Sequence, residues 1–328
     1  MTMLQRFRRF LLAASLASLA LSAAAEAFPS KAVSLVVPSP AGGPSDYVAR
    51  QTQALLPGPL GQPAIVENVA GVGGALGIQR VLRAPADGHS VVFATPMELV
   101  LAPMAYSVAK FKPEELRLVA HVGTADMVLL ARKDFPHATV GEMVNAGRQP
   151  GAKEVSYGSL GKGTLYHLVA ERFGQLAGLK MLHVPYKGAA PALQDLMAGQ
   201  IDLIFMPLAG SVRGLLQEGR VNALGTTSAS RNSQLPSIPA LAQDPAYKAM
   251  DFNVWSAVAV PRGVPAPAVE KLHDAIYQVL ADPQLRKNIE SGGSRLSQPK
   301  SLAELDRMYV EEIERFQAVA KSVHLQPE

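Results

Sequence analysis

Short runs of apolar residues alternate along the chain with longer segments in which apolar residues recur every three or four positions. The run 33–37 carries no charge, and the segment 45–56 that follows it has helical spacing. Such a run is typical of a buried parallel strand, and such a segment is typical of an amphipathic helix. Further strands are predicted at 64–67 and 90–94, with a helix at 77–84 between them. This order predicts a parallel sheet with helices on both faces.

The same alternation begins again beyond residue 122 and predicts a second α/β lobe. Its clearest helix is 164–176, in which Leu165, Leu168 and Val169 share one apolar face. The other elements predicted for this lobe are strands at 127–131, 155–157, 181–186, 202–206 and 223–227, and helices at 140–146 and 191–198.

Residues 229–328 carry few strand patterns and are dominated by helical ones at 266–281 and 301–322. A separate third domain is therefore not expected, and this segment is predicted to complete the first lobe. The chain would then cross between the lobes near residues 122–127 and 224–229, and two extended crossings form a hinge. The predicted lobes are residues 28–124 with 228–328, and residues 125–227.

The N-terminus has the pattern of a secretion signal. Three arginines among residues 6–9 precede the apolar stretch 10–21, which is short for a membrane-spanning helix. The small-x-small sequence Ala25-Glu26-Ala27 follows. Residues 1–27 are therefore predicted to be a cleavable signal peptide, with Phe28 as the first mature residue. Cleavage after Ala25 is the alternative, and Sec export is favoured over the twin-arginine route.

Composition excludes several kinds of chemistry. The 328-residue chain has no cysteine, which excludes disulfides, thiol nucleophiles and cysteine-bound metals. Removing residues 1–27 takes away three arginines and one glutamate, so 31 basic and 27 acidic side chains become 28 and 26. So mild a charge indicates no nucleic-acid partner. The seven histidines form no H-x-H or H-x-x-x-H pair, and neither a metal site nor a cofactor is predicted.

Two glycine-rich turns each follow a strand and open a helix. The first, residues 38–46, is Pro-Ser-Pro-Ala-Gly-Gly-Pro-Ser-Asp, and the second, residues 157–164, is Tyr-Gly-Ser-Leu-Gly-Lys-Gly-Thr. The first N–H groups of a helix lack partners and lie at the positive end of its dipole, so each turn is a candidate anion site. Either turn alone is more often an ordinary turn. The pair, on separate lobes, favours a site for one small anion held between them.

Glycine suits this role because it lets a carboxylate approach the backbone closely and accepts positive φ. A charge-assisted hydrogen bond contributes about 1.5–3 kcal/mol net. Three or four such bonds, less the cost of association, can reach about −8 kcal/mol, which is micromolar binding.

Three segments come close to known nucleotide-binding or catalytic motifs but do not match them. Residues 71–77 lack the sixth-position glycine of a dinucleotide-binding fingerprint, and residues 161–164 lack the spacing of a P-loop. Residues 158–161 have the wrong spacing for a nucleophile elbow, although Ser159 and His167 would be the pair that a hydrolase needs.

A series of short motifs follows in a fixed order along the mature chain. Together they cover essentially all of it, and the ordered combination resembles the Bug-type receptors, which are the periplasmic solute-binding proteins of tripartite tricarboxylate transporters. The motifs are Phe28-Pro29-Ser30-Lys31, Pro38-x-Pro40-x-Gly42-Gly43-Pro44-x-Asp46, Leu60-Gly61-Gln62-Pro63, Val66-Glu67-Asn68, Gly71-Val72-Gly73-Gly74, Ala86-Asp87-Gly88-His89, Tyr157-Gly158-Ser159 through Gly163-Thr164 to His167, His183-Val184-Pro185-Tyr186-Lys187-Gly188, Pro191-Ala192, Gly199-Gln200-Ile201-Asp202 and Leu235-Pro236-Ser237-Ile238-Pro239.

The resemblance implies an α/β periplasmic-binding-protein fold of type II, in which two doubly wound lobes joined by a two-segment hinge close on a ligand in the cleft between them. It implies a periplasmic receptor, not an enzyme, that captures a small organic carboxylate and delivers it to integral-membrane transporter subunits. It implies no cofactor, no metal and a monomeric state. The ligand-binding residues that it carries over to this chain are Ala41, Gly42, Gly43, Ser45, Asp46, Thr95, Met97, Ser159, Gly163, Thr164, His167, Tyr186, Lys187, Gly188 and Met206.

Several residues bear on specificity. Met97 and Met206 stand where the family often has small or polar residues, which predicts a less polar distal pocket and a monocarboxylate with an apolar body. Lys162 either pairs with a second carboxylate or is solvated. Glu98 would repel a dicarboxylate, so it is expected to point to solvent or to select a ligand that carries a hydrogen-bond donor. Trp255 either walls the cleft or fills the hinge region.

Two other functions stay open from the sequence. A receptor of the same kind could report its ligand to a membrane signalling partner, with the same binding chemistry. An exported hydrolase would need a nucleophile, a base and an orienting group, and the residues do not assemble into that set. Aromatic acids, nicotinate-like rings, amino acids and di- or tricarboxylates all stay possible as the ligand.

Overall fold

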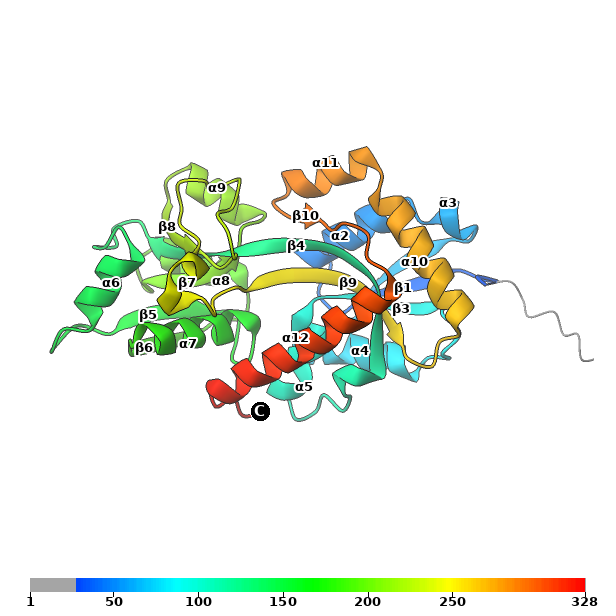
Figure 1. Ribbon diagram of the computed structural model, residues 1–328, viewed down its shortest axis with the longest axis horizontal. Coiled ribbons are helices and arrows are strands. Elements are labelled where there is room, and N and C mark those ends of the chain that lie inside the picture. Colours follow the sequence, from blue (N-terminus) through cyan, green and yellow to red (C-terminus); the bar gives the residue numbers. More distant parts are fainter. Residues whose placement is uncertain (1–27, 328) are drawn as a thin grey trace, which may run out of the picture.

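The computed structural model describes residues 28–327, and the predicted signal peptide lies outside the described residues. Within this range the chain folds into two α/β lobes that are joined by long strands (Figure 1). The strands follow one another in the order β2-β1-β3-β9-β4-β7-β5-β6, with β8 and β10 paired to β4. The predicted class of two α/β lobes is confirmed. None of the helices between residues 28 and 327 is both long and apolar enough to cross a membrane.

The first lobe is built on three parallel strands, with β1 (Val33–Val37) between β2 (Ala64–Asn68) and β3 (Ser90–Ala94). Strand β1 is apolar except for Ser34 because both of its faces are covered: Val33 and Leu35 pack into one core and Val36 into the other. The helical elements of this lobe are α2 (Pro44–Gln53), α3 (Pro57–Leu60), η1 (Val72–Gly74), α4 (Ala75–Arg83), the π-helical turn η2 (Met97–Leu101), α5 (Ala102–Ala105), η3 (Pro113–Glu115), α10 (Ala266–Leu280) and α11 (Pro283–Ser291).

The second lobe repeats this plan. Strand β5 (Val155–Ser159) lies parallel to both β6 (Met181–Pro185) and β7 (Leu203–Pro207), and β8 (Val221–Thr226) runs antiparallel to β4. Its helical elements are α6 (Val140–Gly147), α7 (Leu165–Ala177), α8 (Ala189–Met197) and α9 (Ser211–Gln217). The short helices η4 (Leu241–Gln243) and η5 (Pro245–Tyr247) lie in the segment that follows β8.

Two antiparallel strands connect the lobes. β4 (Leu116–Arg132) pairs with β9 (Asn253–Pro261) along its first part and with β7 and β8 along its second part. Both strands run between the lobes in Figure 1, where α12 (Leu302–Ser322) crosses beside them. The side chain of Trp255, in β9, is buried and donates from Nε1 to Glu312 of α12 at 2.8 Å, so it fills the hinge region.

The strand pattern was underestimated in two places. The prediction found 127–131 but missed the first half of β4, and the expectation of few strands in 229–328 missed β9 and the short β10 (Arg295–Leu296). Helices α9 and α11 were also missed. The central strands of the hinge were therefore the least visible part of the fold in the sequence.

The division into residues 28–124 with 228–328, and 125–227, stays a prediction. The segment that follows β8 keeps contact with second-lobe elements, since Tyr247 stacks on Phe173 of α7 with ring centroids 5.6 Å apart. Thr226 also forms a β-bridge with Ala240. The chain then passes into β9.

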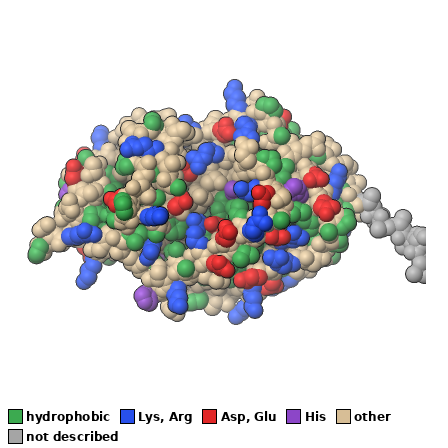
Figure 2. All heavy atoms as spheres, in the orientation of Figure 1, with side chains coloured by type: hydrophobic (Ala, Val, Ile, Leu, Met, Phe, Trp, Pro, Cys, Tyr) green, Lys and Arg blue, Asp and Glu red, His purple; other side chains and the backbone are tan. Residues whose placement is uncertain are grey.

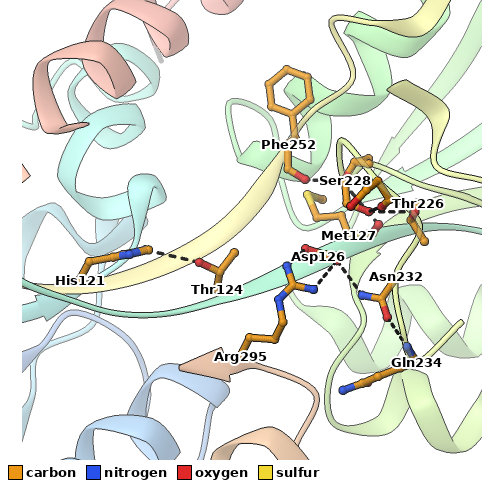
Figure 3. Close-up of polar contacts among 12 residues, drawn as sticks. His121, Thr124, Asp126, Met127, Thr226, Ser228, Asn232, Gln234, Phe252 and Arg295 are labelled. Carbon is orange, nitrogen blue, oxygen red and sulfur yellow. Dashed lines mark hydrogen bonds and ion pairs between the residues drawn. The ribbon is translucent and has the colours of Figure 1, made fainter. Parts of the chain in front are cut away.

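A buried carboxylate joins three segments at the hinge (Figure 3). Asp126 of β4 is 3% exposed and accepts two hydrogen bonds from the guanidinium of Arg295, at 2.7 and 2.9 Å. It also accepts a bond from the amide of Asn232 at 2.6 Å. Bidentate arginine pairs of this kind fix orientation as well as adding energy. This network, the hinge clamp, ties β10 and the segment after β8 to the middle of β4.

We expect Arg295→Ala to destabilise the protein by about 1–3 kcal/mol, because the buried carboxylate of Asp126 loses two charge-assisted hydrogen bonds. Urea unfolding measures this change. Arg286→Ala is the control, because the Arg286–Glu290 pair is a surface pair on one helix. Its loss is expected to cost less than about 0.5 kcal/mol. Equal effects of the two variants would contradict a stabilising role for the hinge clamp.

Candidate ligand-binding site

A cavity of about 530 Å³ lies between the lobes, and we call it the main chamber. Residues of both lobes and of the hinge strands line it. A second cavity of about 350 Å³, the side chamber, adjoins it and shares six lining residues. The residues common to both chambers are Ser39, Pro40, Met97, Glu98, Leu160 and Tyr166.

Loop 1, residues 38–43, joins β1 to α2 and forms one wall of the main chamber. Gly42 has φ +80°, a conformation that suits glycine, and Gly43 is the extended residue before the helix. Pro44 then starts α2, as proline often does at a first helical position. The N–H groups of Ser45 and Asp46 fall in the first turn, where a helix supplies no internal acceptor.

The side chain of Asp46 holds loop 1 from behind. It is 3% exposed and accepts hydrogen bonds from the backbone N–H of Gly42 at 2.8 Å, from Arg50 at 3.0 Å and from Asn68 at 2.9 Å. The hydrogen bond from Arg50 is the main reason why the pKa of Asp46 falls from 3.8 to about 2. Asn68 also donates to the carbonyl of Ser39, so β2 is tied to the loop as well. Asp46 thus positions the loop and does not line either chamber.

Loop 2, residues 160–164, joins β5 to α7 on the other lobe. Gly161 and Gly163 have φ +119° and +76°, and the hydroxyl of Thr164 donates to the carbonyl of Gly161 at 2.7 Å. A Cβ on Gly163 would lie 2.4 Å from Cβ of Ala105, so glycine allows this loop to approach α5 of the first lobe. Leu160 lines both chambers, whereas Gly163 and Thr164 line the side chamber.

A stack of three rings supports loop 2. His183 lies between Tyr157 and His167, with ring centroids 4.9 and 4.3 Å away. Nε2 of His183 contacts the hydroxyl of Ser159 at 2.6 Å, and Nδ1 of His167 accepts from the N–H of Gly163 at 3.1 Å. Burial lowers the pKa of His183 to about 4, so it is neutral near pH 7. Ser159 is fully buried and lines neither chamber, which counts against a role as nucleophile.

The remaining walls of the main chamber are mostly apolar. Met97, beyond β3, and Met206, in β7, both line it, in keeping with the less polar pocket predicted for this chain. Thr95 lines it from the first lobe. The lining that the structure describes includes no Lys, Arg or His side chain, and Glu98 is its one ionisable carboxyl. The main chamber therefore offers backbone groups and hydroxyls, rather than cations, to an anion.

The structure brings most of the predicted residues to the two chambers. Lys187 lines the side chamber, Tyr186 donates its hydroxyl to Asp195 at 2.7 Å, and Gly188 precedes α8. Lys162 lines neither chamber. Predicted residues on the main chamber are Ala41, Gly42, Gly43, Ser45, Thr95, Met97 and Met206; those on the side chamber are Met97, Gly163, Thr164 and Lys187; those on neither are Asp46, Ser159, His167, Tyr186 and Gly188.

Several other lining residues could not be found by reasoning from the sequence. Tyr166 is the second residue of α7, on a helix face that otherwise looks like core, and Thr124 and Ser256 lie on the hinge strands. The turn 209–212 after β7 also lines the main chamber. These positions have no motif of their own, and only the folded hinge brings them to the loops.

Basic and acidic side chains are interspersed on the face that Figure 2 presents. Among residues 28–327, no three His, Asp or Glu side chains come together in a way that could hold a metal ion.

Two α/β lobes around two adjoining chambers, with a glycine loop and a helix N-terminus from each lobe, are the architecture of a solute-binding receptor. The chain matches the family model "Tripartite tricarboxylate transporter family receptor" over residues 48–325, and it belongs to this family. The type II periplasmic-binding-protein fold and the resemblance to Bug-type receptors are thereby confirmed.

Relatives and solved structures agree with this assignment. A protein encoded in the tcbD-tcbE intergenic region of Pseudomonas sp. (strain P51) is 32% identical over 295 residues, covering 89% of this chain and 86% of the relative. The periplasmic binding protein BugD is 28% identical with a TM-score of 0.77, covering 92% of this chain and 100% of BugD.

Two structures from Rhodopseudomonas palustris are also similar. One, solved with adipate, is 29% identical with a TM-score of 0.79, and the match covers 92% of this chain and 100% of the adipate-bound chain. The other, MatC, solved with malate, is 29% identical with a TM-score of 0.76 and covers 89% of this chain and 99% of its own.

The support that Asp46 gives to loop 1 predicts a particular pH dependence. A carboxyl whose folded pKa lies below its ordinary value stabilises the fold above the ordinary value, and this contribution disappears as pH falls through the folded pKa. We therefore expect Asp46→Asn to lower the urea midpoint at neutral pH, and the difference from wild type to close as pH falls from 3.8 towards about 2. A difference in urea midpoint between wild type and Asp46→Asn that stays constant over this pH range would contradict the role of the ionised carboxylate.

Proposed function

We propose that the mature protein is a periplasmic receptor that closes on a small organic carboxylate and presents it to a tripartite tricarboxylate-type membrane transporter. Residues 1–27 would direct export, and the lobes 28–124 with 228–328, and 125–227, would be the moving bodies. The observation that carries the proposal is the meeting of loop 1 and loop 2, from opposite lobes, at two adjoining chambers.

The chemistry of the main chamber supports an anion held without a cationic side chain. The first turns of α2 and α7 present backbone N–H groups at the positive ends of two helix dipoles. Loop 1 is fixed in advance by Asp46 and loop 2 by His167, Ser159 and Thr164. Because these donors are already oriented, little free energy is lost to ordering them when the ligand binds.

The shape supports a small ligand with an apolar body. The main chamber, at about 530 Å³, is within the range of small-molecule sites, and Met97 and Met206 provide apolar, adaptable surface. The relatives solved with adipate and malate indicate that this family accommodates carboxylates of such size. We place the ligand carboxylate at the loops and its carbon skeleton against the two methionines.

A panel of acids tests this proposal by calorimetry and thermal shift. We expect at least one among adipate, malate, benzoate, nicotinate and glutamate to bind with a micromolar Kd, which corresponds to about −8 kcal/mol. An excess of 100-fold over Kd would then stabilise the protein by about 2.7 kcal/mol. The amide of the same acid is the matched control and should bind far more weakly. If folded protein binds no acid of any class, carboxylate capture is wrong.

Variants of the two loops test where the ligand is held. We expect Gly43→Val and Thr164→Ala each to raise the Kd of the tightest-binding acid at least tenfold, which is about 1.4 kcal/mol. The valine side chain obstructs the approach of the ligand to loop 1, and loss of the Thr164 hydroxyl removes its hydrogen bond to the carbonyl of Gly161 in loop 2. Gly58→Val, in a helix remote from the chambers with open space around it, is the control for the first. Thr139→Ala, which removes the cap of α6, is the control for the second. Wild-type affinity in both loop variants would show that the ligand is bound elsewhere.

A further inference from the structure

Glu98 is a buried carboxyl at the junction of the two chambers. It is 6% exposed and lines both of them. Its Oε2 accepts hydrogen bonds from the backbone N–H and the hydroxyl of Thr95, at 2.8 and 2.6 Å. Of the two alternatives stated for Glu98, a side chain that points to solvent is therefore wrong, whereas selection of a ligand that carries a hydrogen-bond donor stays a prediction.

The aliphatic carbons of the Glu98 side chain are closely packed, and its carboxyl is hydrogen-bonded. A Cβ on Gly74 would lie 2.3 Å from Cγ of Glu98 and 3.0 Å from the carbonyl oxygen of Pro38, so a glycine there makes room for the glutamate against loop 1. With φ +89° at Gly74, other residues would also strain the backbone. The carboxyl is thus fixed in the wall and cannot swing away when a ligand enters.

The groups around Glu98 do not neutralise a negative charge. Tyr166, from α7 across the cleft, is buried and lines both chambers, and its hydroxyl pKa is raised by its own burial and by Glu98. Tyr106 and Lys187 line the side chamber, and the side chain of Lys187 is exposed. No cationic side chain lines the main chamber within the described chain. Burial raises the pKa of Glu98 above its ordinary value, and the hydrogen bonds from Thr95, which favour the ionised form, offset only part of that effect.

We propose that Glu98 makes ligand capture proton-linked: the carboxyl, which the N–H and hydroxyl of Thr95 stabilise as an anion in the free receptor, takes up a proton when a carboxylate ligand binds beside it. The inference rests on the proposed function, because it requires an anionic ligand in the main chamber. A ligand carboxylate beside an ionised Glu98 would be repelled by it, because the described lining of the main chamber has no cationic side chain to offset the two negative charges. A protonated Glu98 removes that repulsion and offers an O–H donor to the ligand.

The sign of the pH dependence follows from this coupling. An anionic ligand beside Glu98 raises the pKa of that carboxyl further in the complex, so binding takes up a proton whenever the pH exceeds the pKa of the free receptor. Affinity then falls as pH rises, by up to about tenfold per pH unit. A ligand whose ammonium group paired with an ionised Glu98 would show the opposite trend.

Calorimetry from pH 6.5 to 8.5 tests the inference, with an acid from the panel that is fully ionised throughout. We expect the wild-type Kd to rise at least tenfold over this range and the Kd of Glu98→Gln to change less than twofold. Glutamine preserves the shape, can accept from Thr95 and can donate an N–H, so at pH 8.5 this variant should bind at least tenfold more tightly than wild type. Glu142→Gln, which removes a carboxylate at the start of α6, is the matched control and should follow wild type.

A second measurement does not depend on the variant. Binding heats of the wild type at pH 7.5, in phosphate and in Tris, differ in proportion to the protons exchanged, and we expect net proton uptake. Equal heats, parallel pH profiles of wild type and Glu98→Gln, or loss of binding by Glu98→Gln at every pH would each overturn the inference. Absence of binding by any acid would remove the proposed function and this inference together, whereas tight binding without pH dependence would remove the inference alone.

Discussion

A carboxylate that leaves water for an enclosed chamber must recover its hydrogen bonds from the protein, because an unpaired buried charge is very costly. The main chamber has no cationic side chain in its described lining, so backbone N–H groups and hydroxyls must supply the donors. This constraint accounts for the glycines of loop 1, for the helix that starts beyond each loop, and for the need to bring two lobes together. Each helix alone offers only its first turn.

Backbone donors are useful only where they are held, and the two loops are held by different chemistry. Loop 1 depends on an ion pair and an amide, through Asp46, Arg50 and Asn68, whereas loop 2 depends on neutral rings and hydroxyls around His183. The charge of Asp46 is directed to Gly42 and Arg50 behind the loop. The chamber therefore stays free of fixed charge on that side, which makes Glu98 the exception that governs its electrostatics.

Much of the fold could be predicted from the sequence, since strands with continuous apolar runs and helices with clear periodicity are local signals. The runs 33–37 and 90–94 match β1 and β3, and the second turn was placed correctly before α7. The hinge was harder, because β9 lies in a segment dominated by helical patterns and the first half of β4 has Arg117 and His121 among its apolar residues. Glu98 and Tyr166 illustrate the limit for the site: a carboxyl after a strand and a tyrosine within an apolar helix face carry no local mark of a shared cavity.

The strands that join the two lobes also line the main chamber. Thr124, Val254 and Ser256 line the main chamber and belong to β4 and β9, the strands that join the lobes, and Asp126 of the hinge clamp follows Thr124 by two residues (Figure 3). A ligand in the main chamber therefore touches both lobes and the strands that set their relative orientation. Because the chamber is bounded by both loops, donors from both can reach one ligand only when the lobes are close. Under the proposed function, binding and closure would be a single equilibrium, and the hydrogen bonds and packing formed on closure would contribute directly to affinity.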